Sequence, residues 1–256
     1  MPTEPVLQAV EHALPGARRW LDHPFWEIIG DRPLGLEQLH VLMASLRPQV
    51  STLMFYRPAA RCPTLGRRDA SLSQLEALDR MGDFDALTAC LGIAREAELR
   101  ESNWLHYNAA WTALRVFLRI GASTPLITIA EPVFAHLRQQ FFSRRYRFVP
   151  EFPDVEWLDV LESFSLYNSI ILMMEDLLLL SGGCSERLAV LYIVQCCKCL
   201  DVYEALETHY RSPDRPAVRH HPAIRRVLKR LRTRLASTYA YDGDLSEPRI
   251  VQSQMT

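Results

Sequence analysis

The feature that most constrains this chain is a long helical segment, predicted from about Asp154 to Ser181, with two carboxylates inside an apolar run. From Leu166 to Leu180, apolar residues fall on nearly every face of a helix. A helix that is apolar all round is typical of a protein core. Gly182-Gly183 predicts its end. We therefore expect this helix to be buried among others.

The two carboxylates of this segment, Glu175 and Asp176, have two interpretations. A charged carboxylate in a core is costly unless it is paired, hydrogen-bonded or bound to a cation. Glu175 is therefore either a metal ligand or general base, or the partner of an arginine in a salt bridge. In the second interpretation, one of the two acids reaches solvent.

Helical patterns repeat along the rest of the chain, whereas only Tyr146 to Val149 has β-like character. The other predicted helices run from about His23 to Ile29, Leu36 to Tyr56, Ser71 to Met81, Asp83 to Ile120, Thr124 to Phe142, Glu186 to Tyr210 and Ala223 to Ala240. Pro48 is expected to kink its helix and Gly121 to close another. The sequence predicts an all-α, single-domain bundle of about seven to nine helices over residues 1–240. Residues 241–256 are predicted to be a disordered tail.

Composition limits the classes of protein to consider. The net charge of −1 gives no global electrostatic reason to expect binding to nucleic acid or to a membrane. No uninterrupted apolar run reaches the length of about 18 residues that a membrane span needs. Met1 to Val10 has no apolar core of a signal peptide, so we expect a cytoplasmic protein with free thiols. The near-absence of lysine is typical of a GC-rich bacterial coding sequence.

The cluster Cys196-Cys197-Lys198-Cys199 resembles a metal or redox motif. Adjacent residues of a helix diverge by about 100°, however, so these thiols cannot converge on one ion. Zinc sites built from cysteine pairs also need a second pair, which is absent. We interpret these cysteines as buried small hydrophobic residues.

Further candidate ligands lie on two other predicted helices. Glu101 and His106 share one of them, without clean facing geometry, and Asp201 and Glu204 are three apart on another and can point together. Solvated helix faces are the alternative in both cases. The candidate metal ligands are Glu175, Asp201, Glu204, His106 and Glu101, with Glu175 as the candidate catalytic residue. Such a carboxylate-rich set suits iron or manganese.

The last predicted helix is strongly basic. Its cations are Arg225, Arg226, Lys229, Arg230, Arg232 and Arg234. A surface for nucleic acid or for an acidic partner is one interpretation. The same helix has an apolar stripe formed by Ile224, Val227, Leu228, Leu231 and Leu235, which favours a packed amphipathic helix with a charged back.

Short motifs near the N-terminus are similar to those of a known superfamily. His23-Pro24-Phe25-Trp26-Glu27-Ile28-Ile29, followed by Leu36-Glu37-Gln38-Leu39, resembles the opening of the heme-oxygenase-like superfamily. That superfamily includes TenA proteins, the PqqC oxidase and helical di-iron oxidases and oxygenases. Leu42-Met43-Ala44-Ser45-Leu46 is similar to the second helix of heme oxygenases. Leu180-Ser181-Gly182-Gly183 is similar to the end of the glycine-marked distal helix of that fold.

The resemblance implies a small-molecule oxidase or oxygenase of bacterial metabolism, with iron as a cofactor. Di-iron members place His, Asp and His at four-and-three spacing on a late helix. Here Cys197, Asp201 and Glu204 occupy that spacing, so both histidines would be replaced. This departure favours the alternative of a non-catalytic helical binding or accessory protein. Such a protein would act as a homodimer or with a partner enzyme.

Overall fold

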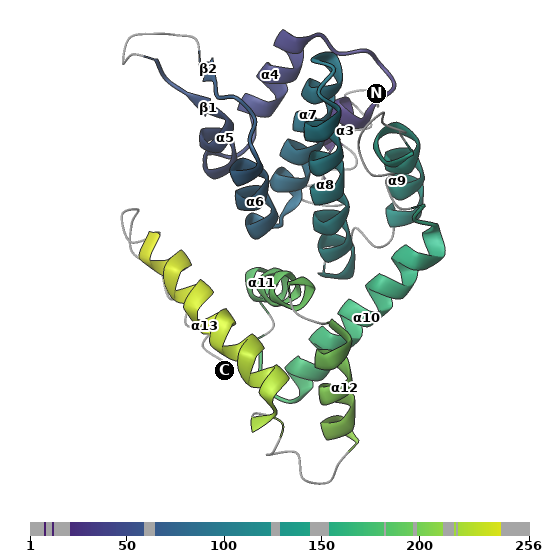
Figure 1. The fold of residues 1–256 in the computed structure, drawn as a ribbon, viewed down its shortest axis with the longest axis vertical. Helices are drawn as coiled ribbons and strands as arrows, with labels where there is room; N and C mark the ends of the chain where they lie inside the picture. Colours follow the sequence, from purple (N-terminus) through teal and green to yellow (C-terminus); the bar gives the residue numbers. More distant parts are fainter. Residues whose placement is uncertain are drawn as a thin grey trace. The chain divides into compact units, whose positions relative to one another are not determined.

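The computed structural model describes residues 8, 12, 21–58, 65–123, 129–143, 154–181, 183–196, 199–211, 218 and 220–241. The all-α prediction is confirmed, because these residues form helices α3 to α13, one π-helical turn and a single two-stranded ribbon (Figure 1). Contacts group the chain into two compact units, Met1–Asn168 and Ser169–Thr256. A single domain over 1–240 stays a prediction. The segment 146–149 and the tail 242–256 lie outside the described residues.

The first unit is built around α7 (Phe84–Leu99). Asp83 caps this helix, and its carboxylate accepts the Ala86 N–H at 3.0 Å. Every residue from Ala86 to Ala94 is buried. Five helices pack against α7, namely α3 (Phe25–Ile29), α4 (Leu36–Ala44), α5 (Pro48–Met54), α6 (Leu72–Met81) and α8 (Asn103–Ser123) (Figure 1). The helix that is buried on all sides is therefore α7.

The predicted helix from Leu36 to Tyr56 is two helices and a strand. Pro48 occupies the first turn of α5 instead of kinking a longer helix. Proline suits this position, because it lacks the N–H that the first turn would leave unbonded. After α5, β1 (Phe55–Tyr56) pairs antiparallel with β2 (Gly66–Arg67).

The predicted helix from Asp83 to Ile120 is also divided, at Glu101. Glu101 has φ 55°, in the left-handed region. Its N–H donates to Glu98 O, and the Ser102 N–H donates to Ala97 O at 2.8 Å. This pair of hydrogen bonds is a Schellman motif, in which glycine is the usual left-handed residue.

Gly121 does not close α8, which continues to Ser123. A Cβ at Gly121 would overlap the ring of Phe164, which is on α10 (Trp157–Asp176). Phe164 also packs on Phe117 of α8, with ring centroids 5.9 Å apart. This glycine therefore allows α10 to approach α8. After α9 (Ala130–Leu137), the π-helical turn η2 (Arg138–Phe142) continues the chain.

The helix α10 corrects the expectation of an all-round buried core helix. It buries one stripe, formed by Val160, Phe164, Tyr167, Ile170, Ile171 and Met174. Leu158 is 70% exposed and Leu172 is 53% exposed. The helix ends at Asp176, before the predicted glycine stop. It ends in a second Schellman motif, with Leu178 at φ 55° as the left-handed residue.

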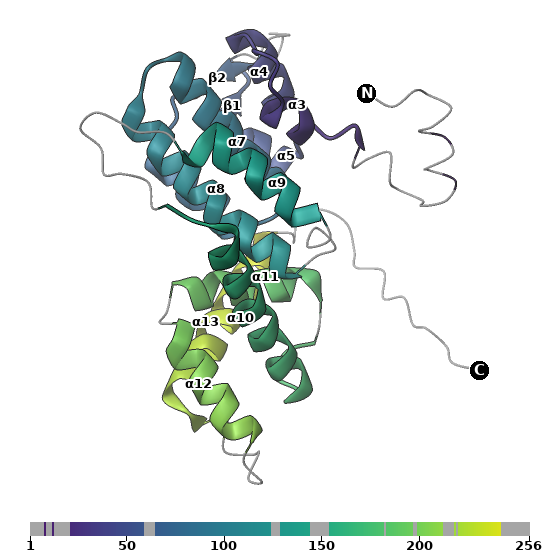
Figure 2. The same cartoon turned by 90° about the vertical axis from the view of Figure 1, so that its right-hand side faces the viewer.

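The second unit contains α11 (Cys184–Gln195), α12 (Cys199–Tyr210) and α13 (Pro222–Tyr241) (Figure 2). The predicted helix from Glu186 to Tyr210 is thus two helices. α13 packs against both α11 and α12. Ala223, Ile224, Val227 and Leu231 are buried and Leu228 is partly buried, which confirms the predicted amphipathic pattern over these residues.

Across the residues that the structure describes, no helix has both the length and the apolar character needed to span a membrane.

Candidate functional site

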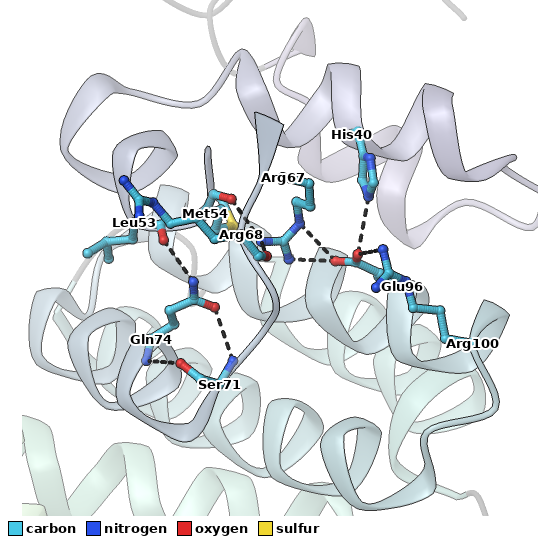
Figure 3. Close-up of polar contacts among 9 residues, drawn as sticks. All are labelled: His40, Leu53, Met54, Arg67, Arg68, Ser71, Gln74, Glu96 and Arg100. Carbon is cyan, nitrogen blue, oxygen red and sulfur yellow. Dashed lines mark hydrogen bonds and ion pairs between the residues drawn. The ribbon is translucent and has the colours of Figure 1, made fainter. Parts of the chain in front are cut away.

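A buried polar cluster surrounds Glu96 on α7 (Figure 3). Glu96 is 2% exposed. Arg67 donates to Glu96 Oε2 through Nε at 3.0 Å and through Nη2 at 2.5 Å. His40 Nε2 lies 3.2 Å and Arg100 Nη2 2.8 Å from Oε1. Both carboxylate oxygens therefore have cationic or imidazole partners, as a buried carboxylate requires.

The β1–β2 ribbon positions Arg67 for this contact. Arg67 Nη1 donates to Met54 O at 3.0 Å, and the Arg68 N–H donates to the same carbonyl at 2.8 Å. Gln74, in the capping box of α6, donates from Nε2 to Leu53 O at 2.9 Å (Figure 3). These contacts tie the end of α5 and the ribbon to α6 and α7. The Glu96 cluster acts as a structural clamp between segments that are distant in sequence.

A second polar cluster surrounds Arg95, the neighbour of Glu96 on α7. Arg95 Nε donates to Ile28 O at 3.3 Å, and Nη2 donates to Gln140 Oε1 at 3.2 Å. The guanidinium lies over the Phe141 ring, 4.7 Å from its centroid. Burial lowers the pKa of Arg95. The cluster joins the end of α3 to the π-helical turn, a type of helix often found at functional sites.

The candidate ligand His106 lies beside this second cluster. It is 1% exposed, and its ring stacks on Phe141 with centroids 6.4 Å apart. Burial, and then the positive charge of Arg95, lower the pKa of His106 to about 4. The imidazole is therefore neutral at pH 7, which is the form that ligates metals.

Glu175, the candidate base or ligand, forms a salt bridge within the second unit. Arg187 donates from Nε to Oε1 at 2.7 Å and from Nη2 to Oε2 at 3.0 Å. Both side chains are partly exposed, 20% for Glu175 and 35% for Arg187. Asp176 is exposed. This geometry is that of the ion-pair interpretation, and a metal ion at Glu175 would have to displace Arg187.

The other candidate ligands do not gather around Glu175 or around His106 within their own units. Asp201 and Glu204 are exposed on α12, and Glu101 is the exposed left-handed residue after α7. Among the described residues, no three His, Cys, Asp or Glu side chains are arranged to hold a metal ion.

The cysteines differ in part from the prediction. Cys196 is exposed, Cys199 is partly exposed, and Cys197 lies outside the described residues. Partial burial raises the pKa of Cys199 to about 11, so its thiol is protonated at neutral pH. Cys90 is buried on α7, and burial raises its pKa as well. Neither of these two thiols has the lowered pKa of a reactive cysteine.

The outer face of α13 is a cationic face formed by Arg225, Arg226, Lys229, Arg230 and Arg232, all exposed. The helix contains no acidic residue. In the described part of the chain, no ion pair joins Arg225, Arg226 or Lys229 to an acid.

Sequence reasoning missed Glu96, Arg67, His40 and Arg95. One signal pointed to the first of them. Glu96 follows the run from Ala86 to Ala94, in which small and apolar residues occupy all faces of a helix. That is the pattern of a buried helix. The partners Arg67 and His40 carry no local signal, because they come from distant segments.

Comparison of the chain with protein-family models, curated proteins and solved structures finds no match.

Proposed function

We propose that this chain is a non-catalytic helical binding protein whose cationic face on α13 docks onto an acidic segment of a partner protein. The observation that carries the proposal is the division of α13 into two sides. One side is packed on α11 and α12, and the other presents exposed cations with no acid on the same helix. Exposed charge of one sign on one face attracts a partner of opposite charge.

An acidic protein segment fits this face better than nucleic acid does. From Arg225 to Arg232 the face is about 10 Å long, the length of two helical turns. The chain as a whole has a net charge of −1, so it lacks the overall positive charge that is typical of nucleic-acid-binding domains. Because the apolar side of α13 is buried in its own unit, the contact is ionic. We therefore expect a transient complex that salt weakens.

The test uses a poly-glutamate peptide as the acidic probe and a short DNA duplex as the competing class. The triple variant Arg225→Gln, Arg226→Gln, Lys229→Gln removes three charges from the cationic face. A matched control, Arg32→Gln, Arg57→Gln, Arg80→Gln, removes three exposed cations elsewhere. We expect the first triple variant to weaken peptide binding about tenfold at low salt, and the control to change it little.

Two results would overturn the proposal. Equal losses in the two triple variants would mean that net charge, and not this face, governs binding. Tighter binding of the duplex than of the peptide, lost in the first triple variant only, would identify a nucleic-acid surface instead.

A second candidate function is a small-molecule oxidase or oxygenase of the heme-oxygenase-like type, with iron or manganese. The buried, neutral His106 beside the π-helical turn favours it, because a neutral imidazole is able to bind a metal. The bidentate pairing of Glu175 with Arg187 counts against Glu175 as its central ligand.

Metal analysis after growth with added iron separates the two candidates. If the chain is the enzyme, iron or manganese should copurify with it. His106→Phe should then lower the metal content and retain the helical circular dichroism. Protein that is metal-free after growth and after reconstitution would exclude the metal-dependent oxidase.

A further inference from the structure

Two histidines meet at the corner between α12 and α13. His209 lies in the last turn of α12, and His221 directly precedes α13. Their rings pack edge to face, with centroids 5.8 Å apart. Both side chains are partly buried, whereas the neighbouring His220 is exposed.

His221 is the N-cap of α13. Its carbonyl accepts the Arg225 N–H at 2.9 Å, which is the first hydrogen bond of the helix. Its Nδ1 accepts the Ala223 N–H at 3.3 Å. Pro222 has no N–H, and the His221 N–H donates to Val218 O at 3.1 Å. The imidazole thus satisfies one of the few N–H groups that this helix start leaves open.

This cap works only while His221 is neutral. An Nδ1 that accepts a hydrogen bond carries no proton, so the single ring proton is on Nε2. A second proton on Nδ1 would turn the acceptor into a donor facing the Ala223 N–H. It would also place a positive charge at the positive end of the helix dipole.

No carboxylate is seen to offset that charge in the described part of the second unit. The titratable partner from α12 is His209, which is itself cationic when protonated. Glu207, also on α12, pairs with Arg211 at 2.7 Å. On α11 the charged side chains are Glu186 and Arg187, which bond Ser181 and Glu175. The nearest charges on α13 itself are Arg225 and Arg226, both cations.

The start of α3 provides an internal comparison. There His23 Nδ1 accepts the Phe25 N–H at 3.1 Å, which is the same local contact. His23 Nε2, however, lies 3.5 Å from Asp85 Oδ1. A carboxylate thus faces the histidine that precedes α3, whereas a second histidine faces the one that precedes α13.

We propose that the corner of α12 and α13 is a pH-sensitive switch, in which protonation of His221 opens the cap and loosens the first turn of α13. That turn carries Arg225 and Arg226 of the cationic face. The effect on partner docking rests on the proposed function, but the opening of the cap does not. Opening is expected as the pH falls from 7.5 to 5.5.

The test measures the exchange protection of the Ala223 amide in the full-length chain by NMR at pH 7.5 and pH 5.5, corrected for intrinsic exchange. We expect protection to fall about fivefold in the wild type, because the loss of one N-cap hydrogen bond changes the equilibrium for helix opening by about that factor. His221→Asn keeps an acceptor that cannot be protonated, so its protection should change little. His220→Asn is the matched control and should behave as the wild type does.

Unchanged protection in the wild type would overturn the switch, and so would an equal fall in His221→Asn. His209→Phe separates the role of the second histidine, because it keeps a ring at the contact and removes the charge. We expect this variant to open at a higher pH than the wild type, because a cationic His209 opposes protonation of the neighbouring His221. Poly-glutamate binding, measured in parallel, tests the proposed function separately. If protection does not change with pH but binding still depends on the charges of the cationic face, the switch alone is refuted.

Discussion

Glu101, one of the candidate metal ligands, is held with left-handed backbone at the end of α7. This backbone costs a non-glycine residue about 1 kcal/mol, whereas glycine adopts it freely. We expect Glu101→Gly to raise the free energy of unfolding in urea by about 0.5 kcal/mol, after the entropy of glycine in the unfolded chain is counted. A loss of bound metal in this variant would instead support the ligand role.

The control for that prediction is Glu76→Gly. Glu76 is exposed within α6, where the backbone is right-handed. Glycine there should lower the free energy of unfolding by about 1 kcal/mol. A comparable loss in Glu101→Gly would contradict the assignment of Glu101 as a left-handed cap residue.

His106 should make the folded state sensitive to mild acid. Its pKa is lowered to about 4 by burial and by Arg95, against about 6.5 in the unfolded chain. As pH falls below 6.5, the unfolded state takes up a proton that the folded state does not, so stability is lost. The loss between pH 7 and pH 5 is about 2 kcal/mol.

Urea unfolding at pH 7 and pH 5 measures this loss, and His106→Phe should abolish most of it. Asp85 is the internal check. Hydrogen bonds from His23 and from the Arg47 backbone lower its pKa, although burial alone would raise it. The stability that Asp85 contributes is lost only as pH falls below about 3.9, the ordinary pKa of aspartate. The prediction would be contradicted if His106→Phe lost as much unfolding free energy between pH 7 and pH 5 as the wild type does.

At the scale of elements, the Glu96 cluster and the Glu175–Arg187 pair should contribute differently to the free energy of unfolding. Glu96→Gln leaves Arg67 buried without its full counter-charge, so we expect a loss of about 3–5 kcal/mol in the free energy of unfolding. The Glu175–Arg187 pair is partly exposed, and Glu175→Gln should cost only about 1 kcal/mol. Equal losses in urea unfolding would show that exposure does not separate the two pairs.

The sequence allowed the helical class and several helix starts to be predicted, because these signals are local. Asp83 and Ser71 are capping residues next to the helices that they cap. The buried helix was misassigned for a physical reason. Leucines such as Leu172 suggested that α10 is buried on all sides. An apolar residue can nevertheless be exposed, as Leu172 is. The small residues of α7 are less apolar, yet they are buried because they allow neighbouring helices to approach.

The candidate site was less predictable, because its partners come from distant parts of the chain. Glu96 meets Arg67 from the ribbon and His40 from α4, and no local spacing indicates either contact. The pairing of Glu175 with an arginine was one of two interpretations, but Arg187 could not be selected as the partner. The positive charge of α13 could be predicted from the sequence, since all of these cations lie close together on a single helix.

At the scale of the whole molecule, the division into two compact units can be tested by scanning calorimetry. If the units unfold separately, the calorimetric enthalpy will exceed the van't Hoff enthalpy, and the transition will resolve into two components. We expect this result at neutral pH. Equal enthalpies in one sharp transition would support the sequence-based prediction of a single domain over 1–240.

The clamp at Glu96 also bears on how fast the chain folds and unfolds. Its contacts with Arg67 and His40 close loops of 29 and 56 residues. Contacts between such distant residues form only after the loop entropy has been overcome, which places them late on the folding pathway. Weakening the clamp should therefore accelerate unfolding and leave the folding rate nearly unchanged. The lifetime of the native first unit, more than its speed of formation, then depends on one buried glutamate.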